Sequence, residues 1–162
     1  MTSIRTCLLA LAAALALLAG PACAEDAAAL AFLRSVYHPY QSSASALDIG
    51  SEEEAARYFV PAVAKLIARD IAESSERNEV GRLDFDPFVG GQDWQPMRID
   101  LAVRMGPGPT RAVATARYKA RGEAKPTVVT LDLQKLDAGW RIADIRWSGQ
   151  AESLVQILSK EQ

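Results

Sequence analysis

The chain has few of the residues that build metal, disulfide or nucleophilic sites. It contains two cysteines, Cys7 and Cys23, and one histidine, His38. Cleavage after Ala24 would remove both cysteines and leave no thiol for a disulfide or a cysteine-based site. With one imidazole the chain cannot form a multi-histidine metal site, and a catalytic triad would have to use His38.

Other patterns are missing as well. The sequence has no Gly-x-Ser-x-Gly elbow, and its glycine-rich stretches at 90–91 and 106–108 lack the spacing of phosphate-binding loops. Lys and Arg form no cluster, which argues against nucleic acid as a partner. We therefore expect neither a serine hydrolase nor a nucleotide-binding protein, and we expect no cofactor and no bound metal.

The N-terminal residues have the pattern of a secretory signal. Arg5 gives the positive start, residues 7–19 are all apolar, and Ala22-Cys23-Ala24 is a small-x-small cleavage pattern. The apolar run is shorter than the ~20 residues that span a bilayer, and no second run of that size follows. The sequence predicts a signal peptide over 1–24 and a soluble periplasmic or secreted protein, with lipid attachment at Cys23 as the open alternative.

Residues 25–162 have the size of a single domain, and their first half is predicted to be helical. From 25 to 37 apolar residues recur at helical spacing, and Pro39 should end this helix near Tyr37. The segment 51–54 has the pattern of a capping box that starts a second helix. A third helix is predicted to begin at Pro61, and its buried stripe comprises Val63, Leu66, Ile67 and Ile71.

The second half alternates between apolar and polar residues. Strands are predicted at 98–105, 111–120, 127–136 and 140–147, joined by short turns, and a short helix near 154–158 closes the chain. Asp137-Ala138-Gly139 is predicted to be a hairpin loop with Gly139 in a left-handed conformation. Helices first and strands second predict an α+β fold, with N-terminal helices packed on a four-stranded antiparallel meander.

The segment Leu83 to Trp94 fits neither a helix nor a strand, because it mixes carboxylates, aromatics and glycines. Its carboxylates Asp84, Asp86 and Asp93 could chelate a hard cation. However, Pro and Phe at 87–88 occupy places where a calcium loop has ligands, and Asp in turns more often bonds its own amides. The second interpretation is the more common one.

Further along the same segment, Gln92, Asp93 and Trp94 offer hydrogen-bond donors, acceptors and a large apolar face. These three residues could orient a small polar ligand. Alternatively, Gln92 and Asp93 hold a long buried loop in shape, since a connection without regular structure must satisfy its own backbone groups. Both interpretations stay open on the sequence alone.

Three further residues are candidates for a site. Tyr37 and Tyr40 lie at the end of the first helix, where Tyr37 is expected to pack inward with its hydroxyl at a pocket rim or in water. Asp144 shares its strand face with Trp140 and Ile142 if the alternation is regular. Its carboxylate could then act as a general base, or it could pair with an arginine, and the arginines in reach are Arg117, Arg141 and Arg146.

Asp84-Phe85-Asp86-Pro87-Phe88 with Gln92-Asp93-Trp94, followed by Gly139-Trp140-Arg141-Ile142, resembles a family of exported bacterial proteins known as domain of unknown function 3828. The Gly-Trp-x-Ile ending is similar to that of nuclear-transport-factor-two-like or cystatin-like cone domains. The resemblance implies a curved antiparallel sheet that wraps helices and leaves a pocket at its open end, without an assigned activity. One departure from the cone is that no strand is predicted between the second and third helices.

Three functions are compatible with these residues. The first is a non-enzymatic exported domain that binds a small molecule, a peptide or an envelope protein through the surface around Asp84 to Trp94. The second is a lyase or isomerase with Asp93 or Asp144 as base and Tyr37 or Tyr40 as acid, by fold analogy alone. The third is a structural or inhibitory envelope protein in which this segment only shapes the fold.

Overall fold

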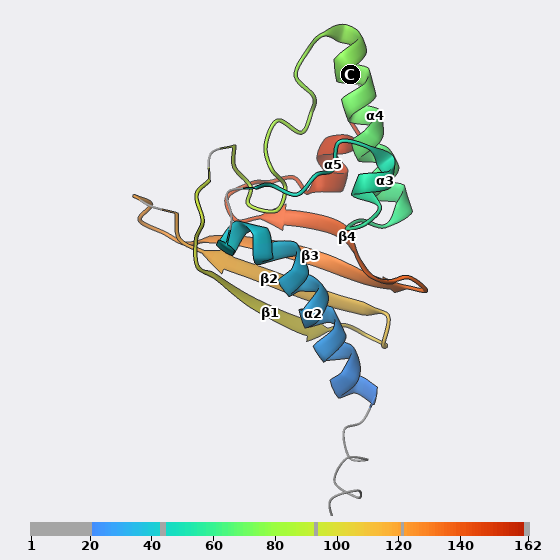
Figure 1. The fold of residues 1–162 in the computed structure, drawn as a ribbon, viewed down its shortest axis with the longest axis vertical. Coiled ribbons are helices and arrows are strands. Elements are labelled where there is room, and N and C mark those ends of the chain that lie inside the picture. Colours follow the sequence, from blue (N-terminus) through green and yellow to red (C-terminus); the bar gives the residue numbers. More distant parts are fainter. Residues whose placement is uncertain (1–20, 43–44, 93, 121, 161–162) are drawn as a thin grey trace, which may run out of the picture.

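A computed structural model describes residues 21–42, 45–92, 94–120 and 122–160. Most of the predicted signal peptide, residues 1–20, and the candidate Asp93 lie outside these ranges. The described chain has the predicted α+β architecture, with N-terminal helices packed against a four-stranded antiparallel meander and a short C-terminal helix. Figure 1 shows helix α2 crossing the sheet, while α3, α4 and α5 gather beyond the edge formed by strand β4.

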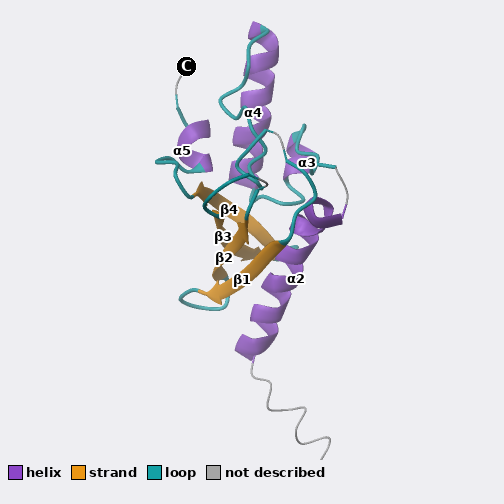
Figure 2. Ribbon diagram, turned by 90° about the vertical axis from the view of Figure 1, so that its left-hand side faces the viewer, coloured by secondary structure: helices purple, strands orange, loops and turns teal. Residues whose placement is uncertain are grey.

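The sheet follows from the alternation of apolar and polar residues. Its strands pair in sequence order, each antiparallel to the one before, and they are β1 (Ile99–Met105), β2 (Arg111–Tyr118), β3 (Thr127–Leu136) and β4 (Gly139–Trp147). Gly139 has φ 104°, which confirms the predicted left-handed residue in the last hairpin. Figure 2 shows α2 against one face of this sheet.

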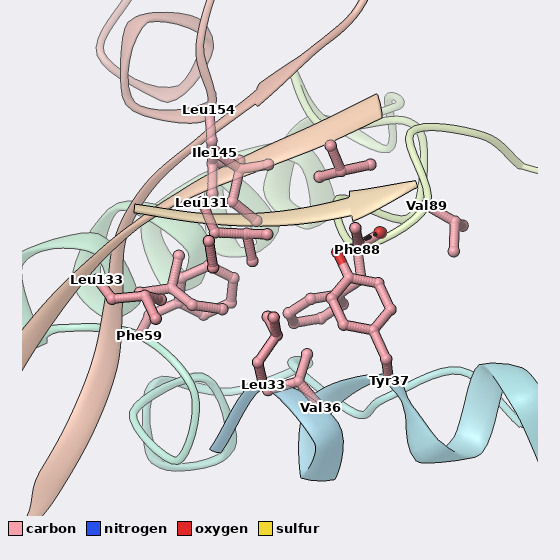
Figure 3. Close-up of a cluster of buried hydrophobic side chains, with 14 of the residues drawn as sticks. Leu33, Val36, Tyr37, Phe59, Phe88, Val89, Leu131, Leu133, Ile145 and Leu154 are labelled. Carbon is pink, nitrogen blue, oxygen red and sulfur yellow. Dashed lines mark hydrogen bonds between the residues drawn. The ribbon is translucent and has the colours of Figure 1, made fainter. Parts of the chain in front are cut away.

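The core lies between α2 (Pro21–Ser42) and the inner face of the sheet. Leu33, Val36 and Tyr37 of α2 are completely buried, and Figure 3 shows them facing Leu131 and Ile145 of the sheet. The inner face of β2 carries Ala112, Ala114 and Ala116, all buried. Such small side chains leave room for the larger residues of the helix and the neighbouring strands.

Helix α2 does not end near Tyr37 as predicted but continues through Pro39 to Ser42. Proline inside a helix is unfavourable, so another interaction must compensate. Tyr40, one residue later, is fully buried, and its ring lies 4.7 Å from that of Trp94. The packing of Tyr40 therefore outweighs the local preference for ending the helix.

Ser51 caps helix α3 (Glu52–Ala55) as predicted, because its hydroxyl accepts a hydrogen bond from the Glu54 amide at 3.2 Å. The reciprocal bond differs from the prediction. The Glu54 carboxylate accepts from the Ser51 hydroxyl at 2.8 Å, where the capping box has it accept from the Ser51 amide. The third helix, α4 (Pro61–Arg77), begins at Pro61 as expected and ends at Asn78 with φ 53°.

The buried stripe of α4 differs from the predicted one. Val63 and Ile67 are buried as expected, but Ile71 is 39% exposed. Asp70 takes the place of Ile71 on the buried face and is only 4% exposed. A carboxylate on the apolar stripe of a helix needs internal partners, and the loop that follows α4 supplies them.

The outer edge of β4 is covered by the connection between α3 and α4. In the continuous segment 45–92 this connection forms no strand, as predicted, but Phe59 makes an isolated parallel bridge with Ile142. The Val60 amide donates to the Ile142 carbonyl at 2.9 Å, and the Ile142 amide donates to the Tyr58 carbonyl at 2.8 Å. Helix α5 (Leu154–Leu158) follows β4 and has a capping box made by Ser153 and Gln156. No helix in the described ranges is long and apolar enough to cross a membrane.

Candidate functional site

The irregular segment Leu83 to Trp94, called here the 83–94 loop, is held by its main chain. Three aromatic side chains from three different elements each donate a hydrogen bond to a loop carbonyl. The pairs are Tyr37 of α2 with Phe88 at 2.9 Å, Tyr118 of β2 with Val89, and Trp147 of β4 with Pro87 at 2.8 Å. Consecutive carbonyls are thereby fixed to the core, and Figure 3 shows the Tyr37 bond.

Asp86 is anchored in the same region by both of its oxygens. Oδ2 accepts a hydrogen bond from the Tyr40 hydroxyl at 2.7 Å, and Oδ1 accepts from the Phe88 amide at 2.8 Å. Burial raises the pKa of the Asp86 carboxyl, although these hydrogen bonds act in the opposite direction. Burial and the nearby Asp86 raise the pKa of Tyr40, so the Tyr40 hydroxyl stays protonated and donates.

The loop also closes on itself. The Gly90 amide donates to the Asp86 carbonyl at 2.8 Å, and the Gln92 side chain donates to the Asp84 carbonyl at 2.8 Å. Gly90 has φ 61°, and a Cβ atom placed there would lie 2.6 Å from the Trp147 ring. Only glycine fits this close approach without displacing the indole.

The start of the loop is held by an ion pair between side chains and by two main-chain hydrogen bonds. The buried Asp70 of α4 accepts from the Arg82 guanidinium at 2.8 Å and from the amides of Arg82 and Leu83 at 3.0 and 3.1 Å. Burial alone would raise the pKa of Asp70, but the amides and the guanidinium together hold it below its ordinary value. Arg82 also donates to Glu73 at 2.8 Å.

A mainly apolar cavity of about 280 Å³ lies between α4, α5 and the first half of the loop. Its apolar walls include Leu47, Ile49, Ile67, Leu83, Phe85 and Leu158, and Asp70 and Asp86 contribute carboxylates to them. This volume is slightly below the ~300–1,000 Å³ of ordinary small-molecule sites. The cavity is thus large enough for part of a ligand.

The second half of the loop borders a larger open depression of about 1100 Å³, called here the Trp94 groove. Its other wall comes from the end of β2 and the connection to β3, with Tyr118, Lys119 and Glu123. Trp94, Met97 and Tyr118 give it apolar surface, and its polar lining includes Gln92, Gln95, Arg98, Lys119 and Glu123. The loop therefore forms a wall of two hollows with different chemistry.

The predicted site residues separate into groups. Tyr37, Tyr40 and Asp86 come together, but in hydrogen bonds that hold the protein's own loop. Gln92 and Trp94 line the Trp94 groove, and Asp84 is exposed. Asp93 lies outside the described residues.

Asp144 lies elsewhere because strand β4 is irregular. The register shifts between Asp132 and Leu133, so that Asp132 pairs with Asp144 and Leu133 with Ile142. The extra residue, Ala143, reverses the alternation, which contradicts the expectation that Asp144 and Ile142 share a face. Ile145 is buried instead, while Asp144 is only partly buried and lines neither hollow.

The carboxylate of Asp144 is used as a cap. Its Oδ1 accepts from the Ile145 amide at 2.9 Å and from the Val155 amide at 3.0 Å, in the first turn of α5. Arg146, one of the predicted partners, instead forms two hydrogen bonds with Asp132 at 2.7 and 2.8 Å. Asp144 therefore joins β4 to α5.

Sequence reasoning missed four anchoring residues: Asp70, Arg82, Tyr118 and Trp147. One of them carried a usable signal, because Asp70 follows Val63 and Ile67 at the spacing of a buried helical face. In the part of the chain that the structure describes, no group of three or more His, Cys, Asp or Glu side chains is placed to hold a metal ion.

Comparison of the chain with protein-family models, curated proteins and solved structures finds no match. The resemblance to the domain of unknown function 3828 and to the cone domains therefore stays a prediction.

Proposed function

We propose that this chain is an exported, non-enzymatic binding domain and that its ligand lies in the Trp94 groove. The ligand classes expected from the sequence are a small molecule, a peptide and an envelope protein. A volume of about 1100 Å³ is more than a compact small molecule fills, which favours an extended ligand such as a peptide segment.

The observation that carries the proposal is the mixed lining of this groove. Trp94 and Met97 offer apolar contact area, while Gln95, Lys119 and Glu123 offer donors and acceptors that point to a polar or charged ligand. Binding sites typically combine apolar surface with a few polar groups of this kind.

The anchoring of the 83–94 loop supports the same proposal. Tyr118 both lines the groove and donates to the Val89 carbonyl, and the Trp94 ring packs on Tyr40. A wall held by the core loses little conformational entropy when a ligand binds. The groove is therefore preorganised on its loop side.

The positions of the proposed catalytic groups argue against the enzymatic alternative. Asp144, one of the two proposed bases, accepts hydrogen bonds from two amides and lines neither hollow, while Asp93, the other, lies outside the described residues. The proposed acids Tyr37 and Tyr40 donate their hydroxyl protons to Phe88 and Asp86 of the protein itself. A general base needs an oxygen that can reach a substrate proton. Export rests on the predicted signal over residues 1–24, whose removal would leave Glu25 as the first residue.

Thermal melting of the chain from Glu25, with fractions of a periplasmic extract, a peptide panel and a metabolite panel as additives, tests the proposal. A ligand at 100 times its Kd stabilises by about 2.7 kcal/mol and raises the melting temperature by several degrees. The variant Lys119→Glu, at an exposed groove position, should lose the shift, and Val80→Ala, exposed outside both hollows, should keep it. If no additive shifts the wild type, or if Lys119→Glu responds as the wild type does, the groove is not the binding site.

A further inference from the structure

The residues around the apolar cavity beside α4 range from completely buried to exposed. Phe88 and Leu158 are completely buried and lie behind the cavity surface, and Ile67 is 2% exposed. At its rim Ala46 is exposed and Ile71 is 39% exposed. Within the described ranges only two large apolar side chains, Ile71 and Val80, are exposed, so the apolar lining reaches solvent at Ile71.

The polar groups in the cavity wall already have partners. Asp70 accepts from Arg82 and from two amides, and Asp86 accepts from Tyr40 and the Phe88 amide. Satisfied carboxylates in a buried wall offer no donor to a ligand, and they disfavour a second negative charge close by. A negatively charged group is therefore disfavoured inside the cavity, and the mainly apolar lining favours an apolar one.

The volume sets the length of such a group. A methylene group takes about the space of one water molecule, which is ~30 Å³ in the liquid. A cavity of about 280 Å³ therefore has room for a chain of roughly eight or nine carbons, while apolar cavities of ~150 Å³ already bind benzene.

From this geometry we propose a second binding site in the protein, in which the cavity takes the alkyl chain of an uncharged amphiphile. The chain enters tail first past Ala46 and Ile71 and lies against the partly exposed side chains of Leu47, Leu83 and Phe85, and the polar headgroup stays in water at the rim. This site lies on the opposite half of the 83–94 loop from the Trp94 groove, and among the described residues Ala46 is the one lining residue that the two hollows share.

A series of straight-chain alcohols from butanol to decanol, titrated into the wild-type protein by calorimetry, tests the proposal. Each added methylene should raise the affinity about fourfold until the cavity is full at about eight carbons, after which the affinity should stop rising. Methyl signals of Leu47 and Leu83, which line the cavity and are partly exposed, should shift in NMR spectra with the bound alcohol. An affinity that does not depend on chain length, or shifts confined to other methyl groups, would overturn the proposal.

Two matched variants locate the entrance. Ile71→Trp places a large ring at the rim and should weaken octanol binding at least tenfold. Val80→Trp adds the same ring at an apolar position that is 76% exposed and outside the cavity, and it should bind octanol as the wild type does. Equal binding by both variants would mean that the alcohol does not enter past Ile71. Lys119→Glu should leave octanol binding unchanged, so the two sites can fail independently.

Discussion

Asp70 and Asp86 lie in the wall of the same cavity and both accept main-chain amides in or beside the 83–94 loop, but their side-chain partners differ in charge. Asp70 has the Arg82 guanidinium at 2.8 Å, whereas Asp86 has the neutral hydroxyl of Tyr40 at 2.7 Å. The pKa of Asp70 is lowered and that of Asp86 is raised. The comparison shows that neutral donors, here a hydroxyl and an amide, do not offset the burial of the Asp86 carboxylate, whereas amides together with a cation do so for Asp70.

Among the substitutions proposed here, removal of Asp70 should lower the free energy of unfolding the most. Asp70→Ala removes the ion pair and the acceptor of two main-chain amides, and it leaves a guanidinium whose side chain is 9% exposed with Glu73 as its acidic partner. Breaking a buried pair in this way costs about 3–5 kcal/mol of unfolding free energy, which urea denaturation measures. Glu73→Ala keeps the Asp70 pair and should cost less than ~1 kcal/mol. A smaller loss for Asp70→Ala than for Glu73→Ala would contradict the central role of Asp70.

A methyl group at Gly90 should disturb the aromatic hydrogen bonds that hold the middle of the loop, and it changes no carboxylate. Gly90→Ala combines a positive φ of 61° with a Cβ atom 2.6 Å from the Trp147 ring. We expect a loss of about 2–4 kcal/mol, from left-handed strain and displacement of the indole that bonds Pro87. Gly91→Ala is the control, because its Cβ would meet no atom within 4 Å and should change stability by less than ~1 kcal/mol. Equal melting of the two variants would contradict the close approach.

Asp86→Ala should lower the free energy of unfolding less than Asp70→Ala does. It removes two hydrogen bonds, but it also removes a partly buried carboxylate that no cation neutralises, and the second effect offsets part of the first. The lost hydrogen bonds to Tyr40 and the Phe88 amide are worth about 1–3 kcal/mol in total, or a fall of several degrees in melting temperature. Differential scanning calorimetry of both variants compares the two anchors directly. A loss for Asp86→Ala as large as that for Asp70→Ala would mean that the cation makes no difference.

The two carboxylates should also respond to pH in opposite directions. The lowered pKa of Asp70 means that its contribution is present above the unfolded value of about 3.8 and is lost as the pH falls through the folded pKa. The raised pKa of Asp86 means that its contribution is present below about 3.8 and is lost as the pH rises through the folded pKa. Unfolding free energies of the wild type, Asp70→Asn and Asp86→Asn, measured between about pH 3 and pH 7, test this. On acidification the advantage of the wild type should shrink over Asp70→Asn and grow over Asp86→Asn, and parallel curves would refute it.

Asp144 is a third carboxylate with main-chain partners, and it accepts an amide in the first turn of α5. Its substitution should lower the stability of the protein the least. Asp144→Ala removes the acceptor for the Val155 amide in α5 and should cost about 1 kcal/mol. Asp144→Asn keeps an oxygen that can accept the same bond and should melt within about a degree of the wild type. If Asp144→Asn were as costly as Asp144→Ala, the negative charge itself would be required.

The strands were predictable because their alternation is a local property of the sequence. The third strand has the predicted limits 127–136, whereas the end of the first helix was wrong, since Tyr40 packs against residues more than forty positions away. The prediction of the face of Asp144 was wrong because one extra residue, Ala143, reverses the side-chain direction. The only sign of it in the sequence is the step of three residues between the apolar side chains of Ile142 and Ile145. The sequence shows that the 83–94 loop is irregular. It does not show that Tyr118 and Trp147 bond to the loop, because which strands lie against the loop depends on the tertiary fold.

The loop is held at its start by the bond between Asp70 and Arg82, and in its middle by aromatic side chains that bond to main-chain carbonyls. The sequence separations of these two sets of contacts imply an order of folding. The bond between Asp70 and the Arg82 side chain spans 12 residues, whereas the bonds from Tyr37 to Phe88 and from Trp147 to Pro87 span 51 and 60. A short loop closes at a lower entropic cost than a long one, and distant contacts wait for the rest of the chain. The turn after α4 can thus form while the sheet is still unpaired, whereas the middle of the 83–94 loop, at Pro87, is fixed by Trp147 only after the last strand has docked.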